Sequence, residues 1–340
     1  MSKESLAVKY RPRSFEDLTE QTAIKDILEN QIRTKTFQHG YLFTGPSGTG
    51  KTTSARIFAS MINDGKGNPI EVDAASNSGV DNIRQIIEDA KRKPLDAEYK
   101  IFIVDECHSL SSGAWQALLK TLEEPPKFTI FILCTTNPEK IPATILSRVQ
   151  RYNFQKISNE GIVIRLGYII AKEIVHSEDI IYTEDAVDYI AKVSTGGMRD
   201  AITLLDKCLS LSRTLNLENV LKTIGAEDYS TFITFLSALE EKEKEISIKV
   251  VEDVYNDGKD VKQFMKDFSK FVLEVEKYGL YKNFDYISLP NTLENELEHL
   301  IDDSLFDIMD FVVSLNNQIK WENDPKTLIE LSILIYCGKE

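Results

Sequence analysis

Residues 45–52 carry the clearest chemical signal in the chain. They follow the pattern G-x-x-x-x-G-K-T and lie between an apolar run at 41–44 and a helical pattern at 51–62. Glycines let the backbone wrap around a polyphosphate, the lysine reaches its outer phosphates, and the final hydroxyl is a ligand for Mg²⁺. We therefore predict a nucleotide-binding P-loop made of these residues: Gly45, Pro46, Ser47, Gly48, Thr49, Gly50, Lys51, Thr52 and Thr53.

Two carboxylates, Asp105 and Glu106, directly follow the apolar run 101–104. Ligands of open α/β sheets bind at the carboxyl ends of the strands. An acidic pair after a strand is common, but beside a P-loop it has a specific chemistry. Asp105 would hold Mg²⁺, and Glu106 would orient the water that attacks the terminal phosphate. Together the two motifs predict hydrolysis of a nucleoside triphosphate.

Further polar residues are candidates for sensing the phosphates. Thr136 follows the apolar run 128–134, so its hydroxyl is expected beside the acidic pair. Arg148 and Arg199 lie in short polar segments, and arginine often binds phosphate through two parallel hydrogen bonds. Each has a plainer alternative, because threonine also occurs at strand ends and arginine in surface salt bridges.

The elements that must position these residues follow from the apolar pattern. Short apolar runs alternate with helical patterns through residues 1–158, which is typical of βαβ units, so we predict an α/β fold with a parallel sheet. Residues 159–222 predict a small helical domain. Residues 223–340 predict an all-helical domain with an apolar stripe that begins at Val261. The second half of the chain has almost no strand signal.

Charge is distributed unevenly along the 340 residues. Lys and Arg number 40 against 54 Asp and Glu, a net charge of −14. This excess argues against a protein that coats nucleic acid by bulk charge. Residues 1–158 hold 21 basic and 19 acidic side chains, whereas 223–340 hold 12 and 25. Any contact with DNA is therefore expected away from the last third of the chain.

Targeting and cysteine signals are weak. The N-terminal segment lacks the apolar core of a signal peptide, and no apolar run reaches the length of about 18 residues that a membrane span needs. We expect a cytoplasmic protein without a membrane partner. The four cysteines are far apart and include no C-x-x-C pair, which predicts buried thiols rather than a zinc site or a disulfide framework.

Five further segments extend the pattern: KYRP at 9–12, FEDL at 15–18, DAASN at 73–77, LLKTLEEPP at 118–126 and ILSR at 145–148. Together with the P-loop and the acidic pair, they resemble the AAA+ ATPases. More narrowly, they resemble the clamp-loader ATPase subunits of bacterial replication, the DNA polymerase III gamma/tau family. The resemblance implies an α/β AAA+ module at 1–158, a helical lid at 159–222 and an all-α collar for oligomerisation at 223–340, where the match is weaker.

The resemblance implies ATP and Mg²⁺ as cofactors and gives each candidate residue a role. Asp105 and Glu106 would form the Walker B motif, and Thr136 would be sensor 1. Arg199 would be sensor 2, which closes the lid over the nucleotide of its own subunit. Arg148 would be an arginine finger that reaches the ATP of a neighbouring subunit, so isolated monomers would hydrolyse ATP poorly. The residues expected near the adenine are Tyr10, Arg11 and Pro12.

The resemblance also implies partners: a sliding clamp, other clamp-loader subunits in a ring, and primer–template DNA. A helix that begins near residue 80 would meet a template phosphate with its unpaired N–H groups, although a solvated helix cap explains the same residues. A helix at 112–123 could carry a clamp contact near Trp115 and Leu118, or these side chains could be core. The expected DNA contacts are Asn77, Ser78, Gly79 and Arg84.

The chain departs from the family pattern in two places. Bacterial members usually carry four zinc-binding cysteines after the P-loop helix, but residues 61–72 contain none, so no zinc is expected. Val149 stands where the family usually has cysteine, which leaves Arg148 in place. The chain ends at Glu340, which suggests the short, gamma-like form; a compact, zinc-free version would suit a bacteriophage replisome.

These observations predict the ATPase subunit of a sliding-clamp loader. ATP binding would drive clamp opening, and primer–template DNA would trigger hydrolysis and clamp release. DNA would lie inside the ATPase ring, away from the acidic collar. One alternative is a recombination or branch-migration AAA+ ATPase. Another is a structural clamp-loader subunit that binds nucleotide without turnover, which an intact Lys51, Glu106 and Arg148 disfavour.

Overall fold

The chain forms two compact units in the computed structural model, which describes residues 4–176, 180–224, 229–301 and 305–338. The first unit is Met1–Val220 and the second is Leu221–Glu340. The predicted AAA+ module and nearly all of the predicted lid lie in the first unit, and the predicted collar lies in the second. The domain boundaries at 158 and 222 stay predictions.

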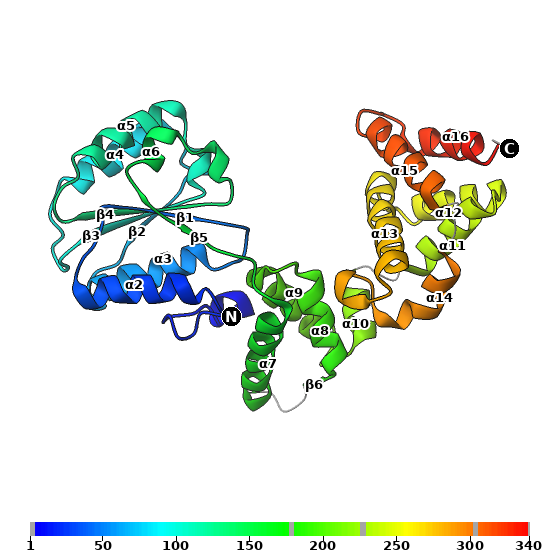
Figure 1. Ribbon diagram of the computed structural model, residues 1–340, viewed down its shortest axis with the longest axis horizontal. Helices are drawn as coiled ribbons and strands as arrows, with labels where there is room; N and C mark the ends of the chain where they lie inside the picture. The colour runs from blue at the N-terminus through cyan, green and yellow to red at the C-terminus, as the bar shows by residue number, and fades with distance from the viewer. Residues whose placement is uncertain (1–3, 177–179, 225–228, 302–304, 339–340) are drawn as a thin grey trace. The chain divides into compact units, whose positions relative to one another are not determined.

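A parallel five-stranded sheet forms the centre of the first unit, with strand order β2-β3-β4-β1-β5 (Figure 1). Its central strands are continuous apolar runs because helices cover both of their faces. The predicted runs at 41–44, 101–104 and 128–134 are confirmed as strands. The strands are β1 (Gly40–Thr44), β2 (Ile70–Asp73), β3 (Lys100–Asp105), β4 (Thr129–Thr135) and β5 (Gln150–Asn153).

Strand alternation divides the core of this unit into two layers. Tyr41 and Phe43 pack in one cluster with residues of α2 and α3, whereas Leu42 packs in the other with residues of α4, α5 and α6. Figure 1 shows these helix groups on opposite faces of the sheet. The helices are α2 (Thr22–Thr34), α3 (Lys51–Ile62), α4 (Val80–Ala90), α5 (Ser112–Glu123) and α6 (Ala143–Leu146), with the 3-10 turns η1 (Cys107–Ser109) and η2 (Pro138–Lys140).

The sequence did not predict β5, an edge strand of mostly polar residues in which Tyr152 alone is buried. It also predicted almost no strand in the lid, whereas β6 and β7 form a short parallel pair. Both are too short or too polar to show an apolar pattern. The lid consists of α7 (Asn159–His176), β6 (Ile181–Tyr182), α8 (Glu184–Val193), α9 (Met198–Leu211), β7 (Thr214–Leu215) and α10 (Leu217–Ile224).

The second unit is helical in its described residues, as predicted. The apolar stripe that begins at Val261 is buried along α13, and Asp324 accepts a hydrogen bond from the Thr327 N–H (3.2 Å) to cap α16. Residues 294–319 form two helices, α14 and α15, and 302–304 lie outside the described residues. The elements are α11 (Tyr229–Glu240), α12 (Lys244–Asn256), α13 (Val261–Tyr281), η4 (Phe284–Tyr286), η5 (Asn291–Leu293), α14 (Glu294–His299), α15 (Leu305–Ile319) and α16 (Pro325–Cys337).

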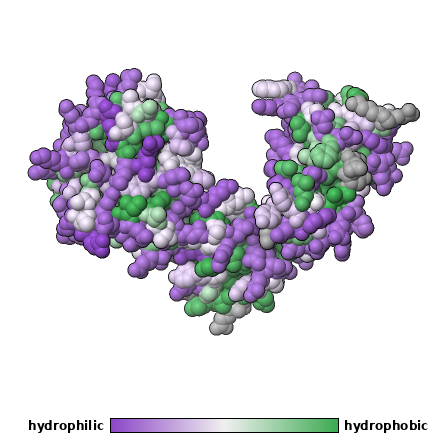
Figure 2. Space-filling view, in the orientation of Figure 1, coloured by the Kyte–Doolittle hydropathy of each residue, from purple (hydrophilic) through white to green (hydrophobic). Residues whose placement is uncertain are grey.

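The face drawn in Figure 2 is largely hydrophilic, with hydrophobic residues in small patches. Within the described ranges, no helix combines the length and the apolar character needed to cross a membrane. The prediction of buried thiols is confirmed, because all four cysteines are buried and free: Cys107, Cys134, Cys208 and Cys337.

Candidate nucleotide-binding site

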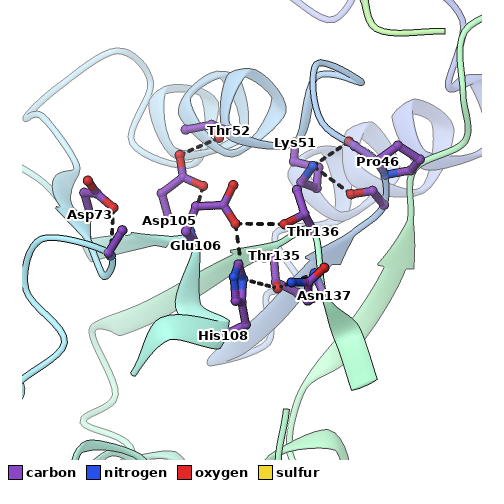
Figure 3. Close-up of polar contacts among 12 residues, drawn as sticks. Pro46, Lys51, Thr52, Asp73, Asp105, Glu106, His108, Thr135, Thr136 and Asn137 are labelled. Atoms are coloured by element: carbon purple, nitrogen blue, oxygen red, sulfur yellow. Dashed lines mark hydrogen bonds and ion pairs between the residues drawn. The ribbon is translucent and has the colours of Figure 1, made fainter. Parts of the chain in front are cut away.

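The P-loop connects the end of β1 to the start of α3. Gly45 has φ 139°, and a Cβ at this position would collide with the carbonyl group of Phe154. Gly48 also lies in the left-handed region, with φ 72°. The ammonium of Lys51 is buried and donates hydrogen bonds to the carbonyls of Gly45 (2.9 Å) and Pro46 (2.7 Å), as Figure 3 shows. The backbone of the P-loop and the ammonium of Lys51 therefore lie together at the N-terminus of α3.

Burial lowers the pKa of Lys51, and the nearby negative charges of Glu106 and Asp105 oppose that shift. The same carboxylates that would organise the reaction thus help keep the lysine protonated. A protonated lysine at this position suits an anionic polyphosphate.

The predicted acidic pair lies at the carboxyl end of β3, against the first turn of α3. The Thr52 hydroxyl donates to Asp105 Oδ2 at 2.8 Å, and the Glu106 N–H donates to Asp105 Oδ1 at 3.0 Å. Glu106 has φ 46°, a left-handed conformation that is unfavourable for a residue with a side chain and is found often at functional sites. A hydroxyl and a carboxylate oxygen in contact beside the P-loop are the ligand types that Mg²⁺ prefers.

Thr136 meets the acidic pair across neighbouring strands. Strands β3 and β4 pair in parallel, so their carboxyl ends lie side by side. The Thr136 hydroxyl donates to Glu106 Oε2 at 3.1 Å (Figure 3). The structure therefore brings together Lys51, Thr52, Asp105, Glu106 and Thr136, which are separated by up to 85 positions in the chain.

A cavity of about 170 Å³ lies where the P-loop, the N-terminal segment and the lid meet. The Met198 N–H of α9 donates to the Gly48 carbonyl at 3.1 Å, which ties the lid to the P-loop. The predicted residues that line the cavity are Tyr10, Arg11, Pro12, Ser47, Gly48, Thr49, Gly50, Lys51, Thr52, Thr53, Asp105, Glu106 and Arg199. Sequence reasoning missed these lining residues: Ala7, Leu18, Thr19, Ile157, Arg165, Met198 and Ile202.

The N-terminal segment that lines the cavity is attached to the lid. The buried carboxylate of Glu173 in α7 accepts hydrogen bonds from Lys9 Nζ and from the Tyr10 hydroxyl, both at 2.6 Å. Arg165 donates to the Tyr10 carbonyl at 2.9 Å. Burial and the bond to the Glu173 carboxylate raise the pKa of Tyr10. No local sequence signal pointed to Glu173 or Arg165, because their partners lie about 160 positions away.

Arg148 lies outside this cavity lining. It follows α6, and its guanidinium donates to Glu123 Oε1 and to the Thr144 carbonyl, both at 2.6 Å. The predicted DNA contacts Asn77, Ser78 and Gly79 also lie outside the lining, in the turn before α4. One turn along this helix, Arg84 is exposed and pairs with Asp81 at 3.1 Å.

Trp115 and Leu118, on the helix of the expected clamp contact, are core residues, and a clamp contact elsewhere on this helix stays a prediction. Trp115 is 6% exposed and Leu118 is 1% exposed, and both pack in the core between α5 and the sheet. The alternative interpretation, that apolar residues on this helix serve packing, is the one that the structure supports.

Comparisons with known proteins give the relatives of this chain. The family model described as DNA polymerase III, delta subunit, matches residues 70–158, and the one described as DNA polymerase III clamp loader subunit, ATPase lid domain, matches 169–214. DNA polymerase III subunit tau of Bacillus subtilis is 35% identical over 99% of this chain and 64% of its own length. DNA polymerase III subunit gamma of Buchnera aphidicola (strain APS) is 30% identical over 81% of each chain.

Solved structures with the same fold include the Holliday junction branch migration motor RuvB of Thermotoga maritima. The TM-score is 0.51 at 22% identity, over 68% of this chain and 79% of RuvB. At this identity the likeness concerns the fold alone. The parallel sheet, the P-loop, the acidic strand end and the helical lid define an AAA+ fold.

Within that class, the sequence relatives identify the family. The chain belongs to the DNA polymerase III gamma/tau family. It spans 64% of the Bacillus subtilis relative and 53% of the Mycoplasma genitalium relative. Within the part of the chain that the structure describes, no group of three or more His, Cys, Asp or Glu is arranged to hold a metal ion.

Proposed function

We propose that this chain is an ATP-hydrolysing subunit of a sliding-clamp loader. The observation that carries the proposal is the convergence on one cavity of the P-loop, the Asp105–Glu106 pair and lid residue Arg199. Membership of the gamma/tau family supports the cellular process that we propose, loading of a clamp for replication. The proposed reaction is ATP hydrolysis, without covalent change to DNA.

The predicted site residues at and beside the cavity have proposed parts in this reaction. The P-loop N–H groups and Lys51 bind the phosphates, and Arg199 approaches them from the lid. Glu106 orients the water that attacks the terminal phosphate, while Thr136 holds the Glu106 carboxylate through the 3.1 Å hydrogen bond. Tyr10 and its neighbours Arg11 and Pro12 form the wall nearest the adenine.

Mg²⁺ is the cofactor that fits these residues. Thr52 and Asp105 already contact each other through oxygen atoms at 2.8 Å, and they would hold the ion. When bound, Mg²⁺ would neutralise negative charge on the phosphates. The zinc module of bacterial family members is not part of the proposal, because residues 61–72 contain no cysteine.

The partners belong to the proposal as well. Arg148 completes the ATP site of a neighbouring subunit, which requires a ring. Residues 77–79 and Arg84 contact the phosphates of primer–template DNA. The near-neutral charge of residues 1–158 favours this assignment, because it does not repel DNA. The ion pair between Arg84 and Asp81 disfavours it, because Asp81 already neutralises the Arg84 charge. ATP binding favours clamp opening, and DNA triggers hydrolysis and clamp release.

The test is ATP turnover by the purified protein with its cognate clamp and its loader partners, with and without primer–template DNA. We expect turnover that rises when all partners are present. Blunt duplex DNA of the same length and charge is the control for non-specific stimulation. Background turnover with every partner present would contradict the proposal. Unwinding or migration of branched DNA would instead support the branch-migration alternative. The only observation that favours this alternative is the similarity of the fold to RuvB.

A further inference from the structure

His108 contacts the carboxylate that the proposed reaction uses. It lies in η1, the turn directly after the acidic pair, and its side chain is 15% exposed. His108 Nδ1 lies 3.2 Å from Glu106 Oε2 and 3.0 Å from the Thr135 hydroxyl oxygen. Figure 3 shows the ring between Glu106 and the end of β4. None of the sequence motifs predicts a role for His108.

The chemistry of these neighbours favours a proton on Nδ1. A carboxylate only accepts hydrogen bonds, so a hydrogen bond between Nδ1 and Glu106 Oε2 needs a proton on Nδ1. The Thr135 hydroxyl oxygen already accepts from the Asn137 N–H at 3.0 Å, and it has a second lone pair for Nδ1–H. The geometry is consistent with an Nδ1–H donor shared between Glu106 and Thr135.

A hydroxyl donor and an imidazole nitrogen thus lie beside the same carboxylate oxygen. Glu106 Oε2 receives the Thr136 hydroxyl at 3.1 Å and faces His108 Nδ1 at 3.2 Å. The backbone of Glu106 is in the left-handed region, and its side chain lines the cavity while remaining 38% exposed. An exposed carboxylate on a strained backbone needs such partners to keep one rotamer.

We propose that His108 is a positioning residue for Glu106, which it holds through Nδ1–H in the orientation that hydrolysis needs. This inference rests on the proposed ATPase function. His108 is not proposed to touch the nucleotide, because it is not among the residues that line the cavity. Its loss should therefore lower kcat and leave nucleotide binding unchanged.

The kinetic test uses amides that replace one ring nitrogen or the other. The amide nitrogen of Asn occupies nearly the position of Nδ1, and that of Gln nearly the position of Nε2. Under the stimulated assay conditions, we expect His108→Gln and His108→Leu to lower kcat about tenfold with KM for ATP unchanged, and His108→Asn to retain most activity. Equal kcat for His108→Leu and wild type, or equal losses for Asn and Leu, would overturn the proposal.

The matched control is His39→Leu. His39 also bonds through Nδ1, to the Thr129 carbonyl at 2.8 Å, but at the opposite end of the sheet, where β1 and β4 begin. Its removal costs the chain a comparable hydrogen bond far from Glu106. We expect kcat to stay at the wild-type value, which separates positioning from a general loss of stability.

A second measurement needs no turnover. Long-range ¹H–¹⁵N spectra of the full chain report which nitrogen of each histidine ring carries the proton. We expect Nδ1–H for His108, and a His108 signal that moves in Glu106→Ala while that of His39 does not. An Nε2–H tautomer would overturn the contact itself. An inactive wild-type protein with the Nδ1–H signal present would instead contradict the ATPase function.

Discussion

Glu106 shows at the scale of one residue how the backbone prepares a site. Strand β3 is extended up to Asp105, and the chain then turns sharply because Glu106 adopts φ 46°. The turn lets Asp105 face Thr52 while Glu106 lines the cavity. Two consecutive carboxylates thereby obtain different surroundings, which is what different roles in catalysis require.

Replacing Glu106 tests its role most directly. Glu106→Gln keeps the size and a hydrogen-bonding oxygen but removes the negative charge, so we expect ATP binding to persist and kcat to fall by about 10²–10⁴. Steady-state turnover and equilibrium binding of ATP measure the two effects. The control is Glu29→Gln, the same chemical change at an exposed position of α2. Hydrolysis at the wild-type rate would refute the assignment.

Replacing Lys51 tests binding rather than turnover. At a nucleotide concentration of about 100 times Kd, binding should stabilise the folded protein by about 2.7 kcal/mol and raise its melting temperature. We expect Lys51→Ala to lose this increase, because the P-loop then lacks its buried cation. Thermal melts with and without Mg²⁺ and ATP measure it. The control is Lys66→Ala, at an exposed position, which should keep the wild-type increase in melting temperature. A full increase in the melting temperature of Lys51→Ala would contradict the P-loop assignment.

At the scale of elements, helix α1 (Leu6–Lys9) packs on the lid helix α9. Its Leu6 N–H donates to Asp206 at 3.0 Å, and Glu173 of α7 holds the next residues along the chain. The wall that lies near the proposed adenine site is therefore attached to lid helices. A movement of the lid would carry this wall with it.

Glu173→Ala tests that attachment. The substitution removes the acceptor of Lys9 and Tyr10, so we expect the free energy of unfolding of the first unit to fall by about 1–3 kcal/mol. Nucleotide affinity should also weaken several-fold, because the segment that ends at Pro12 loses its anchor. Thermal melts and nucleotide titrations measure both. Asp188→Ala, at an exposed position of α8, is the control. Unchanged affinity in a folded Glu173→Ala protein would show that the segment is held in place without this carboxylate.

At the scale of the whole molecule, Arg148 is the residue whose proposed partner lies outside its own chain. Its guanidinium is paired with Glu123 at 2.6 Å, in a partly exposed ion pair of the kind that contributes little to stability. Such a pair can be exchanged for a phosphate at low cost. Assembly, rather than folding of one chain, would then complete the ATP site.

Mixing two inactive variants tests this geometry. The Lys51→Ala subunit supplies an intact Arg148, and the Arg148→Ala subunit supplies an intact P-loop. If the two kinds of subunit pair at random in a ring, about a quarter of the interfaces combine both intact parts. We expect the mixture to regain turnover at these interfaces. ATPase assays of the mixture measure the recovery. Lys51→Ala mixed with Glu106→Gln is the control, because both defects lie in the bound subunit's own site and no interface regains function. Recovery no greater than in this control would exclude an arginine finger.

Parts of the structure with local signals could be predicted from the sequence alone. The P-loop at 45–52 and the acidic pair after 101–104 combine a motif with a neighbouring apolar run, and parallel strands with covered faces must be apolar throughout. The sheet core and the ends of β3 and β4 could therefore be predicted. The polar edge strand β5 could not, because an edge strand with few buried residues has no periodic pattern.

Contacts between side chains that are distant in the sequence form only when the chain folds. Glu173 holds a tyrosine 163 positions away, His108 faces both Glu106 and Thr135, and Trp115 enters the core rather than a surface. Hydrogen-bond partners depend on how helices and strands pack, and packing is set by the sum of many burial contacts rather than by any short motif. The sequence could thus predict the chemistry of the site, whereas the folded chain decided which residues position it.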